Sequence, residues 1–486
     1  MTARCVMVLG TTSGAGKSWL TTALCRYYAR QGLKVAPFKA QNMSNNARVV
    51  AGGEIGSAQY FQALAANAVP DVRMNPLLLK PEKDTQSQVV LMGQVNLALT
   101  AMPWRGRSLH VWPAIAQALD ELMAENDVVV IEGAGSPAEI NLKDSDIVNM
   151  RVALHAKAAC LLVTDIDRGG AFAHLYGTWA MLDAAEQQHI KGFVLNKFRG
   201  DAALLAPGPQ MLEDLTGVPT VATLPMWWQH GLPEEDGVFD ARTLATGKVA
   251  QTIAVIAYPR ISNLDEFQPL KNVPGVRLTW VRSASELAGL GANDWIILPG
   301  SKATSADLDW LRKQALDSAV AQHAASGGRV LGICGGLQML GEALIDPYGI
   351  DGNGPGLGLL GVVTRFEQNK TVRHHVGSWG ETRGAWAALS GLQVQGYEIH
   401  HGVTSLRADM AAAGDATRPV MADGLAWQNA DGNVLGVYLH GLFEDPALLQ
   451  ALFGAEVPTL DQVFDGLADF VEQHFQPGVL QALVEG

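Results

Sequence analysis

Nine residues near the start of the chain, Gly10-Thr-Thr-Ser-Gly-Ala-Gly-Lys-Ser18, constrain its fold more than any other stretch. They follow an apolar run at 6–9, which predicts a buried strand, and precede helical spacing at 19–31. A glycine-rich turn at this junction presents backbone N–H groups and the positive end of a helix dipole to an anion. Lys17 adds a mobile positive charge, and the Ser18 hydroxyl suits a magnesium ion. The stretch therefore predicts a phosphate loop that binds a nucleotide such as ATP with Mg²⁺.

The predicted nucleotide-binding residues are those of this loop and one residue that follows a later apolar run. They are Gly10, Thr11, Thr12, Ser13, Gly14, Ala15, Gly16, Lys17, Ser18 and Asn196. Five residues separate Gly10 from Gly16, where four are usual, and this longer loop resembles that of dethiobiotin synthetase and its relatives. A glycine-rich turn without a nucleotide is the alternative interpretation.

Apolar runs alternate with helical stretches twice along the chain, which predicts a doubly wound α/β domain followed by a second α/β domain. Runs that are apolar throughout suit parallel strands covered on both faces. The expected strands lie at 6–9, 34–38, 128–131, 160–164 and 192–195, and then at 252–257, 276–280, 295–298, 329–333, 360–363 and 434–439. The expected helices of the first domain lie at 19–31, 55–66, 112–124, 147–154, 173–188 and 210–215.

Composition shifts suggest where the domains begin and end. We expect a nucleotide-binding α/β domain at 1–230, a polar linker rich in Pro, Gly and acids at 231–250, and a second α/β domain at 251–447. The tail at 448–486 is expected to form two amphipathic helices separated by a loop.

The bulk composition excludes several classes of partner. A formal net charge of −13 argues against nucleic-acid and anionic membrane surfaces. No apolar run approaches the length of a transmembrane helix, and the start of the chain lacks a signal-peptide pattern. The four cysteines lie far apart and predict neither a disulfide framework nor a zinc site. A reducing cytoplasm and small-molecule substrates are the expectation, and the oligomeric state stays open.

Glu132 ends the apolar run Val128-Val-Val-Ile-Glu132, where an acid in a phosphate-loop domain reaches the magnesium ion. We therefore expect Ser18 and Glu132 to share that ion. Asp165, Asp167 and Arg168 follow another strand run and would either contact phosphate or form a solvated loop with internal salt bridges.

The segment Pro37-Phe-Lys-Ala-Gln-Asn-Met-Ser-Asn-Asn46 offers amides, hydroxyls and a lysine, with no acid among them. Such donors suit a large polyanionic ligand, because amides can donate hydrogen bonds to carboxylates. A polar surface loop is the alternative. The predicted substrate contacts are Lys39, Gln41, Asn42, Ser44, Asn45 and, from a later segment, Lys80.

A second chemical signature is the strand, cysteine and two glycines of Arg329-Val-Leu-Gly-Ile-Cys334-Gly-Gly. This pattern is typical of a nucleophile elbow, in which small neighbours let the turn close and expose the thiol. The backbone amides of Gly300, Ser301 and Gly335 are the expected oxyanion hole. His440, at the end of another strand run, is the expected base for Cys334, with His400 and His401 ranked second.

With these two sites, the chain resembles the cobyrinate and cobyric acid amidotransferase family of cobalamin biosynthesis, and within it the cobyric acid synthase branch. The most specific segments are residues 37–46, 74–81, 132–141 and 397–400. The resemblance implies a dethiobiotin-synthetase-like domain followed by a class I-like glutaminase domain. It implies that ATP activates four carboxylates of adenosylcobyrinic acid a,c-diamide as acyl phosphates, and that Cys334 and His440 release ammonia from glutamine.

Two departures from related patterns matter. Many class I glutaminases carry an acid two residues after the histidine, where this chain has Leu442, so we expect a Cys–His dyad, with Glu444 as a weak substitute. The a,c-diamide synthases carry an acid in the loop after the second strand, where this chain has Gln41 and Asn42. That difference favours the cobyric acid branch over the a,c-diamide synthase reaction. A phosphate-loop switch ATPase with a binding module is the alternative from another class.

Overall fold

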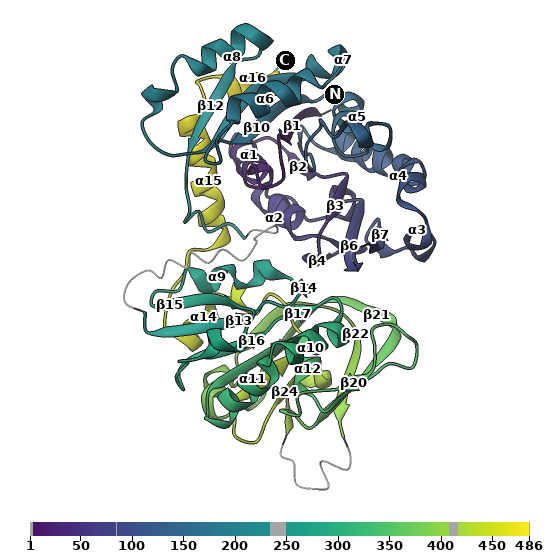
Figure 1. The fold of residues 1–486 in the computed structure, drawn as a ribbon, viewed down its shortest axis with the longest axis vertical. Helices are drawn as coiled ribbons and strands as arrows, with labels where there is room; N and C mark the ends of the chain where they lie inside the picture. The colour runs from purple at the N-terminus through teal and green to yellow at the C-terminus, as the bar shows by residue number, and fades with distance from the viewer. Residues whose placement is uncertain (1–2, 84, 234–248, 408–416, 486) are drawn as a thin grey trace.

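The N-terminal half is built on a six-stranded parallel sheet with the strand order β12-β11-β10-β1-β9-β2 (Figure 1). The computed structural model describes residues 3–83, 85–233, 249–407 and 417–485. The strands of this sheet are β1 (Arg4–Gly10), β2 (Val35–Phe38), β9 (Val128–Glu132), β10 (Ala159–Asp165), β11 (Ile190–Phe198) and β12 (Thr220–Pro225). The five predicted strand runs of this half are confirmed, and β12 was not among them. The doubly wound prediction is correct, since every pairing in this sheet is parallel.

The helices of this half are α1 (Lys17–Arg30), α2 (Ser57–Ala65), α4 (Trp104–Glu125), α5 (Met150–Ala156), α6 (Ala171–Ala180), α7 (Ala184–Gln187) and α8 (Gly208–Thr216). Three predicted helices have wrong boundaries. The helix expected at 112–124 begins earlier, at Trp104. The helix expected at 55–66 begins later, because Ile55 belongs to a strand. The helix expected at 173–188 is two helices, because Asp183 caps α7 with a capping box.

An insertion between β2 and α4 carries short strands that the sequence did not predict. β3 (Gln41–Met43), β6 (Leu77–Lys83), β7 (Gln86–Leu91) and β8 (Gln94–Val95) form a small sheet, followed by α3 (Leu97–Ala101). A separate hairpin pairs β4 (Ala47–Val50) with β5 (Gly53–Gly56). This hairpin packs against the C-terminal half through β21 and β22, whose bounds follow below.

The C-terminal half contains a seven-stranded sheet with the order β15-β13-β16-β18-β25-β24-β23. Its strands are β13 (Gln251–Ile256), β15 (Val276–Val281), β16 (Trp295–Leu298), β18 (Arg329–Ile333), β25 (Val434–Val437), β24 (Ala426–Gln428) and β23 (Arg418–Met421). The first five are parallel, and the last two add antiparallel pairs at one edge. Helices α9 (Gln268–Lys271), α10 (Thr304–Lys313), α11 (Leu316–Ala325) and α12 (Gly335–Leu340) connect them.

One predicted strand of this half belongs elsewhere. The run at 360–363 was expected in the parallel series, but it enters β21 (Val362–Ser378), which pairs antiparallel with β22 (Gln393–Leu406). These long strands form a second sheet with β19 (Ala343–Ile345) and β20 (Gly354–Pro355). The sequence pattern missed this ribbon because its exposed parts are polar.

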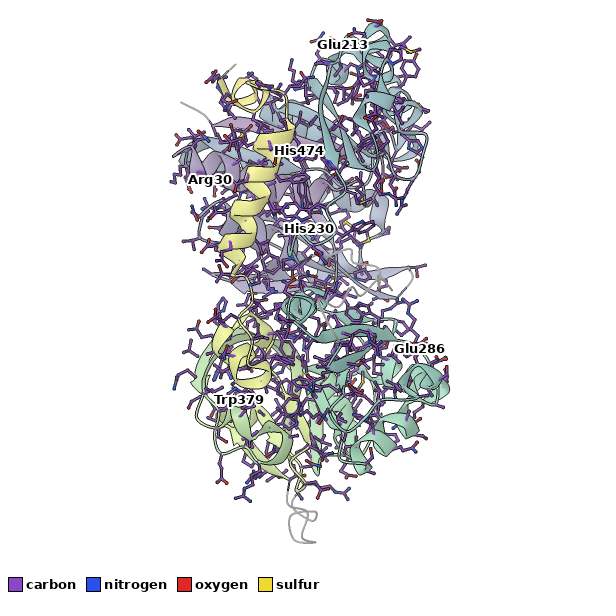
Figure 2. All side chains as sticks on the ribbon, turned by 90° about the vertical axis from the view of Figure 1, so that its left-hand side faces the viewer. Arg30, Glu213, His230, Glu286, Trp379 and His474 are labelled. Atoms are coloured by element: carbon purple, nitrogen blue, oxygen red, sulfur yellow. The ribbon has the colours of Figure 1, made fainter. Side chains whose placement is uncertain are left out.

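The tail forms three helices, α14 (Pro446–Phe453), α15 (Leu460–His474) and α16 (Val479–Glu485), instead of the expected two. α14 packs on the C-terminal half, where Phe453 stacks on Trp295. α15 returns to the N-terminal half and lies along α1, where Asp469 pairs with Arg30 at 2.6 Å (Figure 2). Apolar residues of α15 and α16 complete the core beneath α1.

The expected linker at 231–250 lies mostly outside the described residues. All four cysteines are free thiols and buried. Among the described helices, none combines the length and apolar character needed to cross a bilayer.

Candidate functional site

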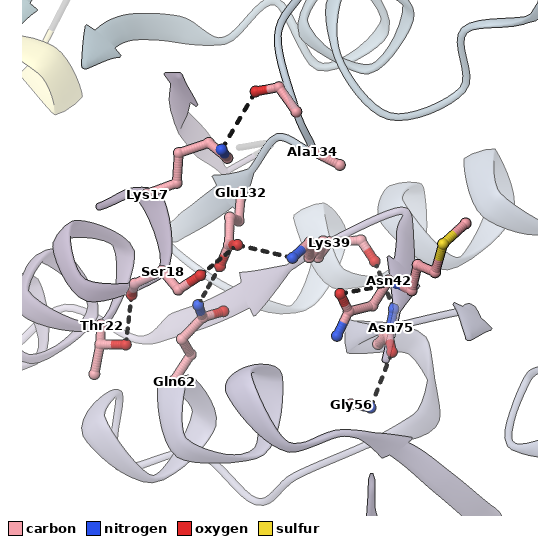
Figure 3. A network of polar contacts seen from close by, with 12 residues as sticks. Lys17, Ser18, Thr22, Lys39, Asn42, Gly56, Gln62, Asn75, Glu132 and Ala134 are labelled. Carbon is pink, nitrogen blue, oxygen red and sulfur yellow. Dashed lines mark hydrogen bonds and ion pairs between the residues drawn. The ribbon is translucent and has the colours of Figure 1, made fainter. Parts of the chain in front are cut away.

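The phosphate loop and Glu132 meet because β1 and β9 are adjacent parallel strands, with Val8 opposite Glu132. Carboxyl ends of parallel strands share one edge of the sheet, so the loop after β1 faces the end of β9. The Ser18 hydroxyl donates a hydrogen bond to Glu132 Oε1 at 2.8 Å (Figure 3). The structure therefore brings together the two residues that the sequence predicted to share a metal ion.

The loop itself has the backbone geometry that its glycines permit. Gly14 and Gly16 have φ values of 73° and 100°, in the left-handed region that favours glycine. A Cβ at Gly16 would overlap the side-chain amide of Asn196, which donates to the Ala15 carbonyl at 2.9 Å. Lys17, the first residue of α1, reaches the Thr12 carbonyl at 3.0 Å. Asn196 thus lies against the loop, and its binding of a nucleotide stays a prediction.

Glu132 is the centre of a buried polar network. Its side chain accepts from Lys39 at 2.8 Å and from Gln62 at 2.6 Å, as well as from Ser18. Burial alone would raise the pKa of Glu132, but the charge of Lys39 and the donated hydrogen bonds outweigh it and lower that pKa. Sequence reasoning missed Gln62, because α2 also carries Ser57 and Gln59 and nothing in the pattern singles out one polar residue.

The predicted substrate residues divide into two groups. Lys39 lies at the phosphate-loop site, and Asn42 is buried nearby at the start of the small sheet. Lys80 lies instead at the boundary with the C-terminal half, where it pairs with Glu54 at 2.6 Å. Burial lowers the pKa of Lys80 to about 7, against the opposing effect of Glu54. Lys80 is therefore held by a protein carboxylate and is not placed beside Lys39.

The remaining three substrate candidates make local contacts. Ser44 accepts a hydrogen bond from the Asn46 backbone, and Asn45 donates to the Pro81 carbonyl at 3.2 Å. Gln41 lines a small cavity together with Arg107 from α4.

The acidic loop after β10 is stabilised by ion pairs with neighbouring cations. Asp165 lies 3.2 Å from Lys197 and 3.6 Å from Arg168, and Asp167 pairs with Arg199. The internal salt bridges of the second alternative are thus present, although Asp165 is buried, and a contact with phosphate stays a prediction.

A pocket of about 530 Å³ lies beyond the carboxyl ends of β11 and β12. Its lining includes Phe198, Arg199 and Trp228, together with His474 from α15. Phe198, which lines this pocket, lies two residues after Asn196 on β11. The pocket is therefore next to the strand end whose Asn196 side chain contacts the phosphate loop.

The second site forms where β16, β18 and β25 lie side by side and parallel. Cys334 directly follows β18, Gly300 follows β16, and His440 follows β25. Adjacent parallel strands thus deliver the predicted nucleophile, base and oxyanion turn to one edge of the sheet.

Cys334 has the strained backbone of a nucleophile elbow, with φ 51° and ψ −105°. A Cβ at Gly336 would overlap the carbonyl of Leu298, which explains the glycine there. Cys334 is 6% exposed, and its thiol contacts the Ile399 carbonyl at 3.7 Å. The same residue helps to raise the pKa of His440, which shows that the thiol and the imidazole interact. The thiol is therefore within reach of an imidazole and not sealed in apolar packing.

Glu266 is the acidic partner that the sequence did not identify. It lies in the 3₁₀ turn η4 (Leu264–Phe267), which follows β14 (Ile261–Ser262). Its two carboxylate oxygens lie 3.2 and 3.3 Å from His440 Nδ1, and one also accepts from the Gly441 backbone at 3.2 Å. The arrangement around His440 is thus a triad in geometry, where a dyad was expected.

The charge of His440 follows from these neighbours. Burial by itself lowers its pKa, but Glu266 and Cys334 outweigh burial and raise the pKa of His440 to about 10. The weak substitute proposed from sequence, Glu444, pairs with Arg48 of the N-terminal half instead. An acid after the first strand of this half, at the same sheet edge as the cysteine, was the signal that could have identified Glu266.

The predicted oxyanion residues lie close to one another and to His440. A Cβ at Gly335 would lie 2.8 Å from the Ser301 nitrogen, and a Cβ at Gly300 would lie 2.9 Å from His440 Cε1. The turn after β16 therefore packs so closely against the turns that carry Gly335 and His440 that no side chain fits at Gly300 or Gly335.

The second-ranked histidines have other partners. His400 Nδ1 contacts the Gly402 carbonyl at 2.8 Å, and its Nε2 contacts Glu398 at 3.0 Å. The ring stacks on Tyr438, with centroids 4.0 Å apart. His401 Nδ1 contacts the backbone carbonyl of Glu367 at 3.1 Å. Both ring nitrogens of His400 are thus occupied, which favours a structural role over that of the base.

Comparison with known proteins agrees with this division into two sites. Residues 6–231 match the CobQ/CobB/MinD/ParA nucleotide binding domain family, and residues 252–448 match the CobB/CobQ-like glutamine amidotransferase domain family. A protein named cobyric acid synthase from Polaromonas naphthalenivorans is 81% identical over 484 residues, covering 100% of both chains. Another of that name from Variovorax paradoxus is 75% identical over 484 residues, again covering 100% of both chains.

A third relative of the same name, from Polaromonas sp., is 78% identical and covers 99% of this chain and 98% of its own. The two domain matches follow the order of the two sites, and the relatives are highly identical over their full length. These two findings identify the family of the chain. It belongs to the cobyric acid synthase family and is a glutamine-hydrolysing amide ligase with a nucleotide-binding domain.

Proposed function

We propose that the chain uses ATP and glutamine to amidate four peripheral carboxylates (b, d, e and g) of adenosylcobyrinic acid a,c-diamide, giving adenosylcobyric acid. The observation that carries this proposal is the presence on one chain of two complementary sites. One places Ser18 and Lys39 on a buried carboxylate at a phosphate loop. The other places the Cys334 thiol and the His440 imidazole after adjacent parallel strands, with Glu266 against the imidazole. The names of the full-length relatives support the choice of substrate.

At the first site, we infer that the loop amides and Lys17 hold the phosphates of ATP. The Ser18 hydroxyl and the Glu132 carboxylate are oxygen donors, which Mg²⁺ prefers, and they lie 2.8 Å apart, so this pair fits the ion. When bound, Mg²⁺ would neutralise charge on the phosphate oxygens. Lys39 is placed to orient the substrate carboxylate, and its charge favours the carboxylate's approach to the γ-phosphate.

The transfer converts an unreactive carboxylate into an acyl phosphate. A carboxylate oxygen attacks the γ-phosphorus, and ADP leaves. Ammonia then attacks the acyl carbon, and phosphate leaves with the C–O bond electrons, since phosphate is a far better leaving group than oxide. The pocket beside Asn196 is the proposed site of the nucleotide base, with Trp228 and Phe198 as apolar walls.

At the second site, the Cys334 thiolate attacks the side-chain amide carbon of glutamine. The oxygen of the tetrahedral intermediate is held by backbone amides of Gly300, Ser301 and Gly335. His440 gives its proton to the departing ammonia, which leaves a thioester. His440 then takes a proton from water, and hydrolysis of the thioester releases glutamate. Glu266 keeps the imidazole oriented and stabilises its charged form.

The test is incubation of the enzyme with ATP, Mg²⁺, glutamine and the a,c-diamide, followed by mass spectrometry over time. We expect four successive mass decreases, each equal to replacement of a hydroxyl group by the lighter amino group. A substrate left unchanged, or a chain that amidates cobyrinic acid twice and stops, would contradict the proposal.

A further inference from the structure

The hairpin of β4 and β5 belongs to the nucleotide-binding half in sequence but packs against the amidotransferase half. Arg48 on β4 is 1% exposed, although an arginine at the boundary between two halves would ordinarily keep its charge in water. Its guanidinium pairs with Asp265 and with Glu444, both from the amidotransferase half. Burial opposes its charge, but these carboxylates raise the pKa of Arg48 well above its ordinary value.

The partners of Arg48 are the immediate neighbours of the proposed glutaminase triad. Asp265 precedes Glu266 in η4, and Glu444 lies in the turn that follows His440. The guanidinium carbon also lies 5.1 Å from the centre of the Tyr397 ring, and that ring stacks on His440 with centroids 5.4 Å apart. Arg48 therefore contacts all three segments that surround the catalytic imidazole.

The two residues before Arg48 also form hydrogen bonds with η4 and with the residue that precedes it. Asn46 Oδ1 accepts from the Leu264 backbone at 2.9 Å, and the Ala47 carbonyl accepts from Asn263 Nδ2 at 2.9 Å. Asn263 Nδ2 also donates to the Tyr397 hydroxyl at 2.8 Å. The turn that presents Glu266 is thus fixed by residues of the nucleotide-binding half.

Electrostatics explain why a cation is needed at this position. Glu266 lies against His440, while Asp265 and Glu444 pair with Arg48, so three buried or half-buried carboxyl groups lie in the segments next to this histidine. Like charges in a poorly solvated space repel strongly, and a second carboxylate can compete with Glu266 for the imidazole. Arg48 neutralises the other two, which leaves Glu266 as the acid that faces His440.

We propose that Arg48 is a positioning residue of the glutaminase, so that the nucleotide-binding half completes the catalytic machinery of the other half. This inference depends on the proposed glutaminase site. Residues 39–48 run from Lys39 at the phosphate-loop site to Arg48 beside the triad. This segment therefore couples the nucleotide-binding site to the glutaminase site. Glutamine hydrolysis then requires the two halves to be docked as seen in the structure.

The experiment compares full-length variants for glutamine hydrolysis and for the pH dependence of Cys334 alkylation by iodoacetamide. Arg48→Met should lower kcat by on the order of 100-fold with KM for glutamine nearly unchanged, because misplacement by about 1 Å has effects of that size. It should also change the alkylation profile. Arg48→Lys, which keeps the charge, should recover much of the activity. Adding Asp265→Asn to Arg48→Met should recover part of it by removing a competing carboxylate.

Lys370→Met is the matched control. Lys370 on β21 pairs with Glu54 of the hairpin at 2.5 Å, so this variant breaks another buried ion pair between the halves without touching η4. It should keep kcat within about threefold, in line with a change remote from the reacting groups. Ammonia-dependent amidation checks that the nucleotide-binding half of each variant is folded.

Two results would overturn the inference. Wild-type kcat and alkylation profile in Arg48→Met would show that Arg48 does not position the triad. Equal losses in Arg48→Met and Lys370→Met would indicate a general docking defect. If Arg48→Met fails to fold, Arg48→Lys and the Arg48→Met/Asp265→Asn pair decide the question by the same readouts. Hydrolysis of glutamine by Cys334→Ala would instead contradict the proposed function and leave the role of Arg48 without a triad to position.

Discussion

The charge on His440 is the quantity through which Glu266 acts, and Glu266→Gln tests it directly. Glutamine has the shape of glutamate and keeps an oxygen to accept from the Gly441 backbone, but it carries no charge. The variant therefore removes the electrostatic partner of the imidazole with little change in packing. We expect the pKa of His440 to fall and glutamine hydrolysis to slow.

The size of the effect follows from the distances. Opposite unit charges 3.2 Å apart, the shorter contact between Glu266 and His440, attract by about 5 kcal/mol at an effective dielectric constant near 20. That energy corresponds to roughly three to four pKa units. Since the pKa of His440 is about 10 with Glu266 present, the variant should bring it to about 7 or below, where burial favours the neutral ring.

Two measurements report this change. An NMR titration of labelled histidine gives the pKa of His440, and the alkylation rate of Cys334 against pH shows whether the neighbouring imidazole is charged. In the wild-type chain the raised pKa keeps the imidazolium through pH 8, so the alkylation rate should vary little between pH 7 and 9. In Glu266→Gln it should rise with pH across that range, and kcat should fall by on the order of 100-fold.

Glu398→Gln is the matched control, because Glu398 is a buried acid paired with another histidine, His400, in the same half. It should leave the alkylation profile of Cys334 as it is in the wild-type chain. An unchanged pKa of His440 in Glu266→Gln would refute the electrostatic reasoning. Equal changes in both variants would show that the effect is not specific to the triad.

Three further predictions follow from the two sites and the boundary between them. Cys334→Ser should abolish glutamine-dependent amidation but retain amidation with free ammonia, measured by product mass; loss of both in a folded protein would contradict two separate sites. Lys39→Met should slow amidation with either nitrogen source while glutamine hydrolysis continues, and parallel assays of both reactions check this. Glu54→Gln should lower the unfolding temperature at pH 7, because Lys370 and Lys80 outweigh burial and hold the pKa of Glu54 at about 2. That stabilisation is fully present above the unfolded value near 4.5 and is lost as pH falls towards 2, so the difference from wild type should narrow in acid; a constant difference would refute it.

Local patterns in the sequence determined the parts of the two sites that lie on single segments. The phosphate loop could be read because its glycines, Lys17 and Ser18 are contiguous and the flanking strand and helix are strongly periodic. Cys334 could be identified as a nucleophile because the tight turn around it needs small residues at fixed positions. Glu132 and His440 were found because each ends an apolar strand run, and parallel strands carry such ends to one edge.

Only the tertiary structure decided which distant segments complete these sites. Glu266 reaches His440 because the chain after β13 and β14 folds back over the sheet edge that carries Cys334, and an acid after a strand is by itself only a weak signal. Arg48 and α15 each cross to the other half of the chain, which no local periodicity encodes. A sequence pattern reports the conformation and burial of its own segment, whereas these contacts depend on how the halves dock. The chemistry could therefore be assigned from the sequence, but its coupling between the two halves could not.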